Sequence, residues 1–239
     1  MNKVIVLVLL SAAVVVAGEK FTQLKVVSAS SRLESAVGVW WGIGKNAPVA
    51  VWFHGGMSSG NCEKGLVAGR DFSEMFPGFT TVSVSACKNN HWVTRTAVEW
   101  VDAALDSVAA RRGVPVDSVH LVGISDGGLG VVAYTSWGGR GQRSRLLMST
   151  YGPALGHAED VALQLKSRRG RWLFLQGGSD RLYPARETTT WNGLFCQNVG
   201  SECDMRFDPE GEHDWSYWQN KRKNWILEFF SEIPLTKTR

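Results

Sequence analysis

The chain has 239 residues, a formal net charge of +4, 44% hydrophobic residues and 20% charged residues. This length fits one domain with a full hydrophobic core, and the charged fraction is ordinary for a globular protein. The positive charge is spread along the chain, with one dense basic cluster at Lys221-Arg222-Lys223. Nucleic-acid binding needs a larger basic face on a recognisable module, so we expect no nucleic-acid partner.

The N-terminus has the pattern of a secretory signal peptide. A positive n-region at residues 1–3 precedes a nearly unbroken apolar segment from Val4 to Val16, and Ala17-Gly18 offers small residues for cleavage. An uncleaved membrane anchor is the alternative, although the apolar segment is short for one. We expect a signal peptide over residues 1–18 and one mature domain over residues 19–239. The mature protein would be secreted or periplasmic, with no stable membrane insertion after cleavage.

Strand-like and helix-like segments then alternate, which favours an α/β fold with a mostly parallel sheet in a single domain. The first two strands are expected to form an antiparallel pair. The predicted strands are Phe21–Ser28, Val37–Trp41, Val49–Phe53, Thr80–Ala86, Ser118–Ile124, Arg145–Ser149, Arg171–Leu175 and Asp204–Phe207. The predicted helices are Thr94–Arg112, Leu129–Trp137, Ala158–Lys166, Pro184–Phe195 and Trp215–Ser231.

The most informative motif is Gly123-Ile124-Ser125-Asp126-Gly127. It lies between a predicted strand and a predicted helix, where G-x-S-x-G is typical of a nucleophile elbow. A serine on so sharp a turn needs unusual backbone angles and small neighbours two residues to either side, and glycine provides that space. Glycine-rich chains also produce this pentapeptide by chance. Its value depends on the residues that would complete the site around Ser125.

A serine hydroxyl becomes a strong nucleophile only when a base takes its proton. Asp180 and His213 follow Ser125 in the chain order of α/β-hydrolases, and Asp180 would orient His213. All three residues, and His54, come just after predicted strands, and the carboxyl ends of parallel strands meet at one edge of a sheet. The alternatives are a turn or surface role for Asp180 or His213, Asp160 or Asp208 as the acid, and His91 or His157 as the base.

An oxyanion hole needs backbone N–H groups that point at the developing negative oxygen. One donor would be the N–H of Asp126, directly after the nucleophile. The second is expected in the loop His54-Gly55-Gly56-Met57, where glycines let the backbone approach the substrate. Gly56 and Met57 are both candidates, and a glycine turn without a catalytic part is the alternative.

The carboxylate of Asp126 is unusual at this position. If it pointed inward it would oppose a developing oxyanion, so we expect it to point away and to accept local hydrogen bonds. An inward orientation would depress activity or favour a cationic substrate.

Several further side chains are candidates for lining the substrate site. Most tryptophans in a domain pack in its core, so a structural role is the alternative for each tryptophan. The substrate-binding candidates are His54, Gly55, His91, Trp92 and Trp215.

The four cysteines are Cys62, Cys87, Cys196 and Cys203. An even number of cysteines in an exported chain predicts two disulfides, with three possible connectivities. The pairs Cys62–Cys87 and Cys196–Cys203 are favoured because each closes a local segment. No C-x-x-C spacing occurs, so we expect no zinc site.

With these residues in place, the chain resembles secreted α/β-hydrolases of the esterase family that includes feruloyl and acetylxylan esterases, S-formylglutathione hydrolases and mycolyltransferases. Residues 123–128 and 211–218 carry the resemblance, and residues 108–117 are similar to secreted feruloyl esterases and polyhydroxybutyrate depolymerases. The resemblance implies the α/β-hydrolase fold, with helices on both faces of the sheet. Asp126 departs from the family, which usually has Met, Ala or Gln there. The short stretch from Tyr151 to Asp180 leaves little room for a lid.

The leading hypothesis is a secreted serine esterase that forms an acyl-enzyme on Ser125 and needs no metal or organic cofactor. Its partner would be an ester, either a small molecule or an accessible polymer side group. A serine peptidase or polyester depolymerase on the same fold is the second hypothesis, and a non-catalytic binding protein of this fold is the third. The sequence leaves the oligomeric state open.

Overall fold

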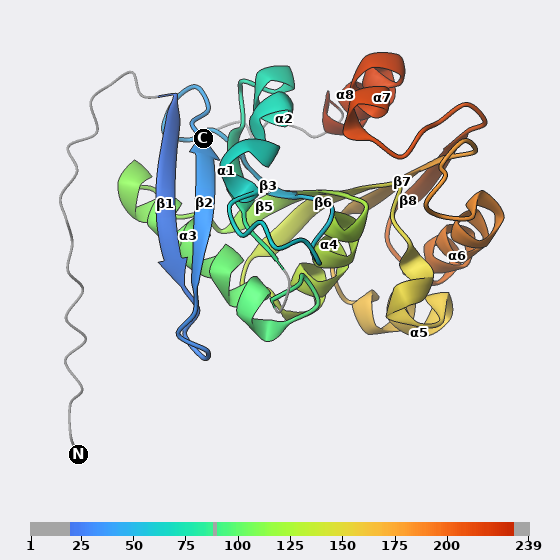
Figure 1. Ribbon diagram of the computed structural model, residues 1–239, viewed down its shortest axis with the longest axis horizontal. Coiled ribbons are helices and arrows are strands. Elements are labelled where there is room, and N and C mark those ends of the chain that lie inside the picture. The colour runs from blue at the N-terminus through green and yellow to red at the C-terminus, as the bar shows by residue number, and fades with distance from the viewer. Residues whose placement is uncertain (1–19, 88–89, 232–239) are drawn as a thin grey trace.

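A computed structural model describes residues 20–87 and 90–231 of the chain, so the expected signal peptide lies outside the described residues (Figure 1). The described residues form an eight-stranded sheet with the order β1-β2-β4-β3-β5-β6-β7-β8. Its strands are β1 (Phe21–Val27), β2 (Glu34–Trp40), β3 (Val49–Phe53), β4 (Thr80–Val84), β5 (Ser118–Ile124), β6 (Gly141–Met148), β7 (Arg171–Gly177) and β8 (Cys203–Asp208).

The sheet is antiparallel at one edge and parallel elsewhere. β1 pairs with β2 and β2 with β4 in antiparallel register, whereas the strands from β4 through β3 to β8 are all parallel. Figure 1 shows β1 and β2 at one end of the sheet and β7 and β8 at the other. Central strand β3 is buried along its whole length, as expected for an apolar strand covered on both faces.

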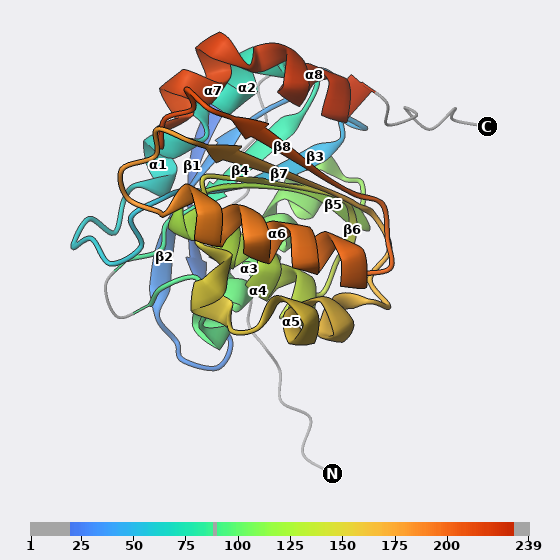
Figure 2. The ribbon, with the colours of Figure 1, turned by 90° about the vertical axis from the view of Figure 1, so that its right-hand side faces the viewer.

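Helices cover both faces of the sheet (Figure 2). One apolar cluster joins the sheet to α3, α4, α5 and α6, and the other joins it to α2, α7 and α8. The helices are α1 (Gly65–Ala68), α2 (Arg70–Met75), α3 (Arg95–Arg112), α4 (Asp126–Trp137), α5 (Ala158–Leu165), α6 (Ala185–Asn198), α7 (Trp215–Lys221) and α8 (Lys223–Ser231), with a 3₁₀ helix η1 at Gly152–Leu155.

The structure corrects three expectations about helices. Helix α4 begins at Asp126, directly after Ser125, and not at Leu129. The expected helix over residues 215–231 is two helices, because Arg222 leaves the helical conformation and donates to the Asp208 carboxylate, with 3.0 Å from Nη2 to Oδ1. Helices α1, α2 and η1 were not expected at all.

Both favoured disulfides are present. Cys62–Cys87 joins the loop after β3 to the residues after β4 across a separation of 25 residues. Cys196–Cys203 joins α6 to the start of β8 across 7 residues. Within residues 20–87 and 90–231, no helix has both the length and the apolar character needed to cross a membrane.

The two disulfides should contribute unequally to stability, because the longer closed loop removes more entropy from the unfolded chain. We expect the double variant C62S/C87S to lower the free energy of unfolding by about 3 kcal/mol, and C196S/C203S by about 2 kcal/mol. Urea denaturation at pH 7, with the wild-type protein in parallel, measures both losses. A larger loss for the shorter loop would contradict this order.

Candidate active site

The residues expected in the site lie in loops at the carboxyl-terminal ends of the parallel strands. Ser125 follows β5, Asp180 follows β7, His213 follows β8, and the loop at residues 54–57 follows β3. These four strands are parallel, so their carboxyl ends point the same way (Figure 1). Parallel topology therefore gathers residues that lie far apart in the sequence.

Ser125 sits on a strained turn between β5 and α4. Its backbone has φ 55° and ψ −128°, a conformation that L-residues seldom adopt. A side chain on Gly127 would overlap the carbonyl oxygen of Phe53, and one on Gly123 would overlap the backbone of Gly127. Both glycines of the G-x-S-x-G motif are therefore required by close packing, as a nucleophile elbow demands.

Asp180 and His213 form a hydrogen-bonded pair. His213 Nδ1 lies 2.9 Å from Asp180 Oδ2, and the Asp180 side chain is fully buried. The other carboxylate oxygen accepts the backbone N–H groups of Leu182 and Tyr183 at 2.9 and 3.1 Å. A carboxylate only accepts, so Nδ1 carries the proton and Nε2 is left free to act as a base.

The rival acids and bases are placed elsewhere. Asp208 is buried and accepts hydrogen bonds from Tyr217 and Arg222, which ties the end of β8 to helix α7. Asp160 lies in the first turn of α5, and His157 is the residue before that helix. Among the candidates, Asp180 and His213 are the carboxylate and imidazole that pair with each other, and Tyr183 contacts both His213 and Ser125.

Tyr183 is a site residue that the sequence analysis missed. Its hydroxyl lies 3.3 Å from Ser125 Oγ and 3.3 Å from Asp126 Oδ1. Its ring meets the His213 ring edge-on, with 5.0 Å between centroids, and stacks on Tyr151 at 5.3 Å. The available signal was its position three residues after Asp180, where a turn capped by an aspartate brings the following residues back to it.

Tyr183 also determines where the Ser125 hydroxyl points. The phenolic proton is donated to Asp126, so the Ser125 hydroxyl donates to the tyrosine oxygen. Among the hydrogen bonds of the described residues, Ser125 Oγ pairs with Tyr183 and not with His213. Hydrogen bonds between a serine and its base are often absent or long in structures without substrate and tighten only when substrate binds.

Comparison with solved structures identifies the fold of the chain. No family model matches the chain, and no curated protein sequence does. An esterase from Pyrococcus furiosus matches with a TM-score of 0.66 at 12% identity, covering 88% of this chain and 92% of that one. A carboxylesterase from Bacillus subtilis matches with a TM-score of 0.60 at 14% identity, covering 89% and 92%. The chain has the α/β-hydrolase fold.

Another α/β-hydrolase neighbour is a larger protein. An acylaminoacyl peptidase from Pyrococcus horikoshii matches with a TM-score of 0.64 at 14% identity, covering 89% of this chain. The chain spans only 42% of the length of that peptidase. At such low identity these neighbours establish the shared fold alone.

The Asp126 carboxylate points toward this site, whereas the sequence analysis expected it to point away. Its Oδ2 accepts the backbone N–H of Met57 at 3.2 Å, and its Oδ1 accepts the Tyr183 hydroxyl. Met57 is distant in sequence, so this hydrogen bond is not the local one that was expected. The Tyr183 hydroxyl therefore contacts both the Asp126 carboxylate and Ser125 Oγ.

The two candidate donors after β3 lie beside the elbow. A Cβ on Gly55 would be 3.1 Å from Ser125 Cβ, so glycine there permits close approach of the two loops. Gly56 has φ 66°, which favours glycine. The Met57 N–H is engaged by Asp126, so it becomes available to an oxyanion only when that carboxylate moves. As the first residue of α4, Asp126 has an N–H without a helical acceptor.

Two of the substrate-binding candidates are buried in the core. Trp92 is 1% exposed, and its Nε1 donates to the carbonyl of His54. His54 is 3% exposed, and its Nε2 accepts the Ala86 N–H at 3.0 Å while Nδ1 donates to the Gly55 carbonyl at 2.8 Å. These side chains hold the loop after β3 in place and offer almost no surface to a substrate.

The other two aromatic candidates lie at the margin of the core. Trp215 is half-buried and packs edge-on against Trp52, with 4.9 Å between centroids. His91 is half-buried, and its carbonyl accepts the Thr94 hydroxyl at 2.8 Å. Neither side chain has a ring contact or hydrogen bond to Ser125, Asp180 or His213 among the described residues.

A groove of about 820 Å³ lies next to Tyr183. It runs between η1 with the start of α5 on one side and α6 on the other, and Pro184, Glu187 and Trp191 are among its lining residues. Glu187 also accepts the Tyr151 hydroxyl at 2.7 Å, which links the groove to the stacked tyrosines. The groove itself is not lined by Ser125, Asp180 or His213.

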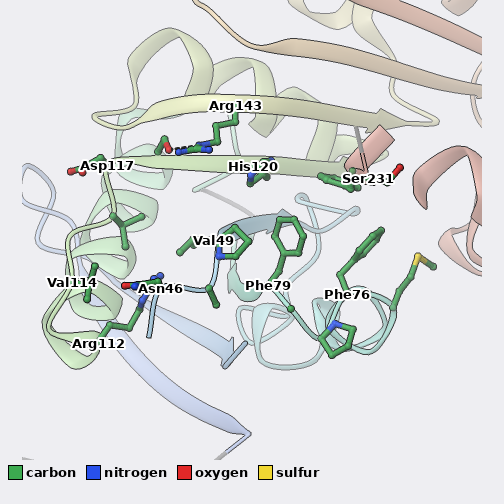
Figure 3. Close-up of a pocket in the computed structure, with 18 of the residues that line it drawn as sticks. Asn46, Val49, Phe76, Phe79, Arg112, Val114, Asp117, His120, Arg143 and Ser231 are labelled. Carbon is green, nitrogen blue, oxygen red and sulfur yellow. Dashed lines mark hydrogen bonds between the residues drawn. The ribbon is translucent and has the colours of Figure 1, made fainter. Parts of the chain in front are cut away.

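A second cavity, of about 930 Å³, lies at the amino-terminal ends of β3 and β5 (Figure 3). It is lined by Val49 and Ser118, which begin β3 and β5, and by Phe79, Arg112 and Arg143. The proposed nucleophile lies at the carboxyl end of β5, so this cavity is separated from it by the length of a strand.

Burial lowers the pKa of His54 to about 4, and burial likewise lowers the pKa of His120 to about 4. Both side chains are neutral in the folded protein at neutral pH. His120 is 2% exposed, and its Nδ1 pairs with Ser144 Oγ at 2.8 Å.

These two histidines should make the protein less stable in acid. Below pH 6.5 the unfolded chain binds a proton at each imidazole, whereas the folded protein binds it only near pH 4. The free energy of unfolding should therefore fall as the pH drops from 6.5 toward 4, by roughly 2–3 kcal/mol per histidine. Urea denaturation at pH 7 and pH 4.5 measures the loss. The variant His120→Asn should lose less on acidification than the wild type, and an equal loss would refute this account.

Proposed function

We propose that this chain is a secreted serine esterase that hydrolyses carboxylic esters through an acyl-enzyme on Ser125. The observation that carries the proposal is the Asp180–His213 hydrogen bond of 2.9 Å beside a serine on a strained elbow. A buried carboxylate, an oriented imidazole and a serine on a strand-to-helix elbow are the parts that nucleophilic acyl transfer requires. The esterases among the structural neighbours support it at the level of fold.

The proposed reaction begins when Ser125 turns from Tyr183 to His213. His213 Nε2 takes the hydroxyl proton while Ser125 Oγ attacks the ester carbonyl, and Asp180 stabilises the imidazolium. The tetrahedral oxyanion accepts the N–H of Asp126 and a second N–H from Gly56 or Met57. His213 then donates its proton to the leaving alkoxide. Water, activated by His213, hydrolyses the acyl-enzyme and restores the serine.

The shape of the site supports an accessible ester as the substrate. Between Tyr151 and Asp180 the chain contains only η1, α5 and β7, so this stretch supplies little material for a lid. The groove beside Tyr183 is open to solvent at the protein surface. A soluble ester or an ester side group of a polymer suits such a site better than a buried lipid.

A serine peptidase is the second candidate, because an acylaminoacyl peptidase is among the structural neighbours. Attack on an amide and attack on an ester use the same triad, so the arrangement of Ser125, Asp180 and His213 fits both. A polyester depolymerase on the same fold belongs to this second candidate, because it would use the same triad on a polymeric substrate.

Secretion is supported by the two disulfides. Disulfides persist in oxidising compartments and are rare in a reducing cytosol. The pairs Cys62–Cys87 and Cys196–Cys203 therefore agree with an export signal over residues 1–18. We propose that the mature domain acts outside the cytoplasm.

A fluorophosphonate probe tests the catalytic proposal. We expect the folded protein to gain the mass of one phosphonyl group on Ser125, and Ser125→Ala to lose this labelling. Ser149→Ala is a matched control, because Ser149 also has a positive φ at a strand end but bonds Trp218 and the Glu212 carbonyl instead of facing a base. Labelling of another residue, or none in the folded wild type, would refute the proposal and favour a non-catalytic binding protein.

Replacing Asp180 should reduce turnover without removing the nucleophile. Asp180→Asn leaves the shape of the side chain but favours the wrong histidine tautomer, so we expect kcat on a nitrophenyl ester to fall by about 10³–10⁴. An unchanged kcat would show that Asp180 does not orient His213.

A substrate panel separates the esterase from its alternatives. We expect hydrolysis of nitrophenyl acyl esters, and the panel adds methyl ferulate, acetylated xylan, a short polyhydroxyalkanoate and a peptide anilide. A kcat/KM for the anilide that exceeds those of all the esters would favour the peptidase.

A further inference from the structure

The carboxylate of Asp126 lies beside Ser125. Asp126 Oδ1 and Ser125 Oγ are each 3.3 Å from the same Tyr183 hydroxyl, so carboxylate and nucleophile are neighbours. Asp126 is half-buried, which leaves its side chain accessible from the site. A substrate carbonyl that reaches Ser125 therefore brings its α-carbon close to a carboxylate.

This carboxylate is held by neutral groups. Its hydrogen-bond partners are the Met57 N–H and the Tyr183 hydroxyl, and no salt bridge among residues 20–87 and 90–231 includes Asp126. The ammonium group of nearby Lys64 donates to the carbonyl oxygens of Gly56 and Gly55 instead, at 3.1 and 3.5 Å. The negative charge of Asp126 thus has no cation in direct contact.

The negative charge of Asp126 disfavours the attack of Ser125 on a neutral ester. When Ser125 attacks, the developing oxyanion lies against the N–H of Asp126, and the carboxylate of the same residue repels it. The carboxylate also occupies the Met57 N–H, which is a candidate oxyanion donor. An acyl group with a cation next to its carbonyl would pair with the carboxylate and offset this repulsion.

Asp126 is held in place by contacts from two other segments. Its partner Tyr183 stacks on Tyr151, and its other partner, the Met57 N–H, belongs to the loop after β3. A role for Asp126 only as an acidic residue at the start of α4 would account for neither the tyrosines nor the hydrogen bond to Met57.

We infer that Asp126 is a specificity-determining residue that selects esters whose acyl group carries an ammonium group on the α-carbon, as in α-amino acid esters. The inference rests on the proposed esterase function of Ser125. The carboxylate binds the ammonium group, and the acyl-transfer step itself is unchanged. The products are the free amino acid and the alcohol.

The test compares two esters of nearly equal shape. L-alanine ethyl ester carries an α-ammonium group where ethyl isobutyrate carries a methyl group, and at pH 6.5 that amine is mostly protonated. The measured quantity is the ratio of kcat/KM for the alanine ester to kcat/KM for the isobutyrate. We expect Asp126→Asn to lower this ratio at least tenfold, because the amide keeps the shape and the acceptor oxygen but loses the charge. Asp126→Ala should lower it similarly.

Asp160→Asn is the matched control. Asp160 is an exposed carboxylate in the first turn of α5 that does not line the groove and has no hydrogen bond or salt bridge to Ser125, Asp126 or Tyr183 among the described residues, so this variant removes a surface charge alone. We expect its ratio to equal that of the wild type. An unchanged ratio in both Asp126 variants, or an equal fall in Asp160→Asn, would overturn the inference.

The two proposals fail in different ways. Fluorophosphonate labelling of Ser125 together with hydrolysis of ethyl isobutyrate would establish the esterase even where the ratio contradicts the role of Asp126. A folded protein that is not labelled at Ser125 would overturn both.

Discussion

The close approach of β5, α4 and the end of β3 at Ser125 is the constraint on which the site depends. Ser125 has a positive φ, a conformation that costs on the order of 1–3 kcal/mol for a residue with a side chain. Gly123 and Gly127 remove the side chains that would prevent this turn, and Gly127 packs against the carbonyl of Phe53. This turn places the Ser125 hydroxyl at the carboxyl-terminal edge of the sheet, next to the first N–H groups of α4 and to the loop that follows β3.

The loop after β7 supplies Asp180, which holds His213, and Tyr183, which contacts Ser125. Asp180 accepts from His213 with one oxygen and from the backbone of Tyr183 with the other, so one buried carboxylate positions both the imidazole and the tyrosine. Tyr183 in turn contacts Ser125 and Asp126. Tyr183 therefore connects the Asp180–His213 pair to the elbow that holds Ser125.

Local patterns in the sequence were enough to predict much of the framework. Strands β3 and β5 have the predicted bounds, because each is a short apolar run between turn residues. The order of Ser125, Asp180 and His213 identified residues that the fold does bring to one edge. The start of α4 was missed because Gly127 and Gly128 have low helix propensity, and tertiary packing overrides it.

What the sequence could not predict depends on contacts between distant segments. The Asp126 carboxylate turns inward because its partners are Met57 and Tyr183, and no local pattern reveals such partners. The helix expected over residues 215–231 breaks because Arg222 pairs with Asp208 in another element. His54 and Trp92 have side chains suited to a site, yet only the fold shows that they are buried.

A crystal structure of the protein inactivated with diethyl nitrophenyl phosphate tests the central claim most directly, because the phosphoryl oxygen occupies the place of the oxyanion. The account predicts phosphorus bonded to Ser125 Oγ and a phosphoryl oxygen that accepts the N–H of Asp126 and a second N–H from Gly56 or Met57. Phosphorus on another residue, or a phosphoryl oxygen that turns away from these N–H groups, would contradict it.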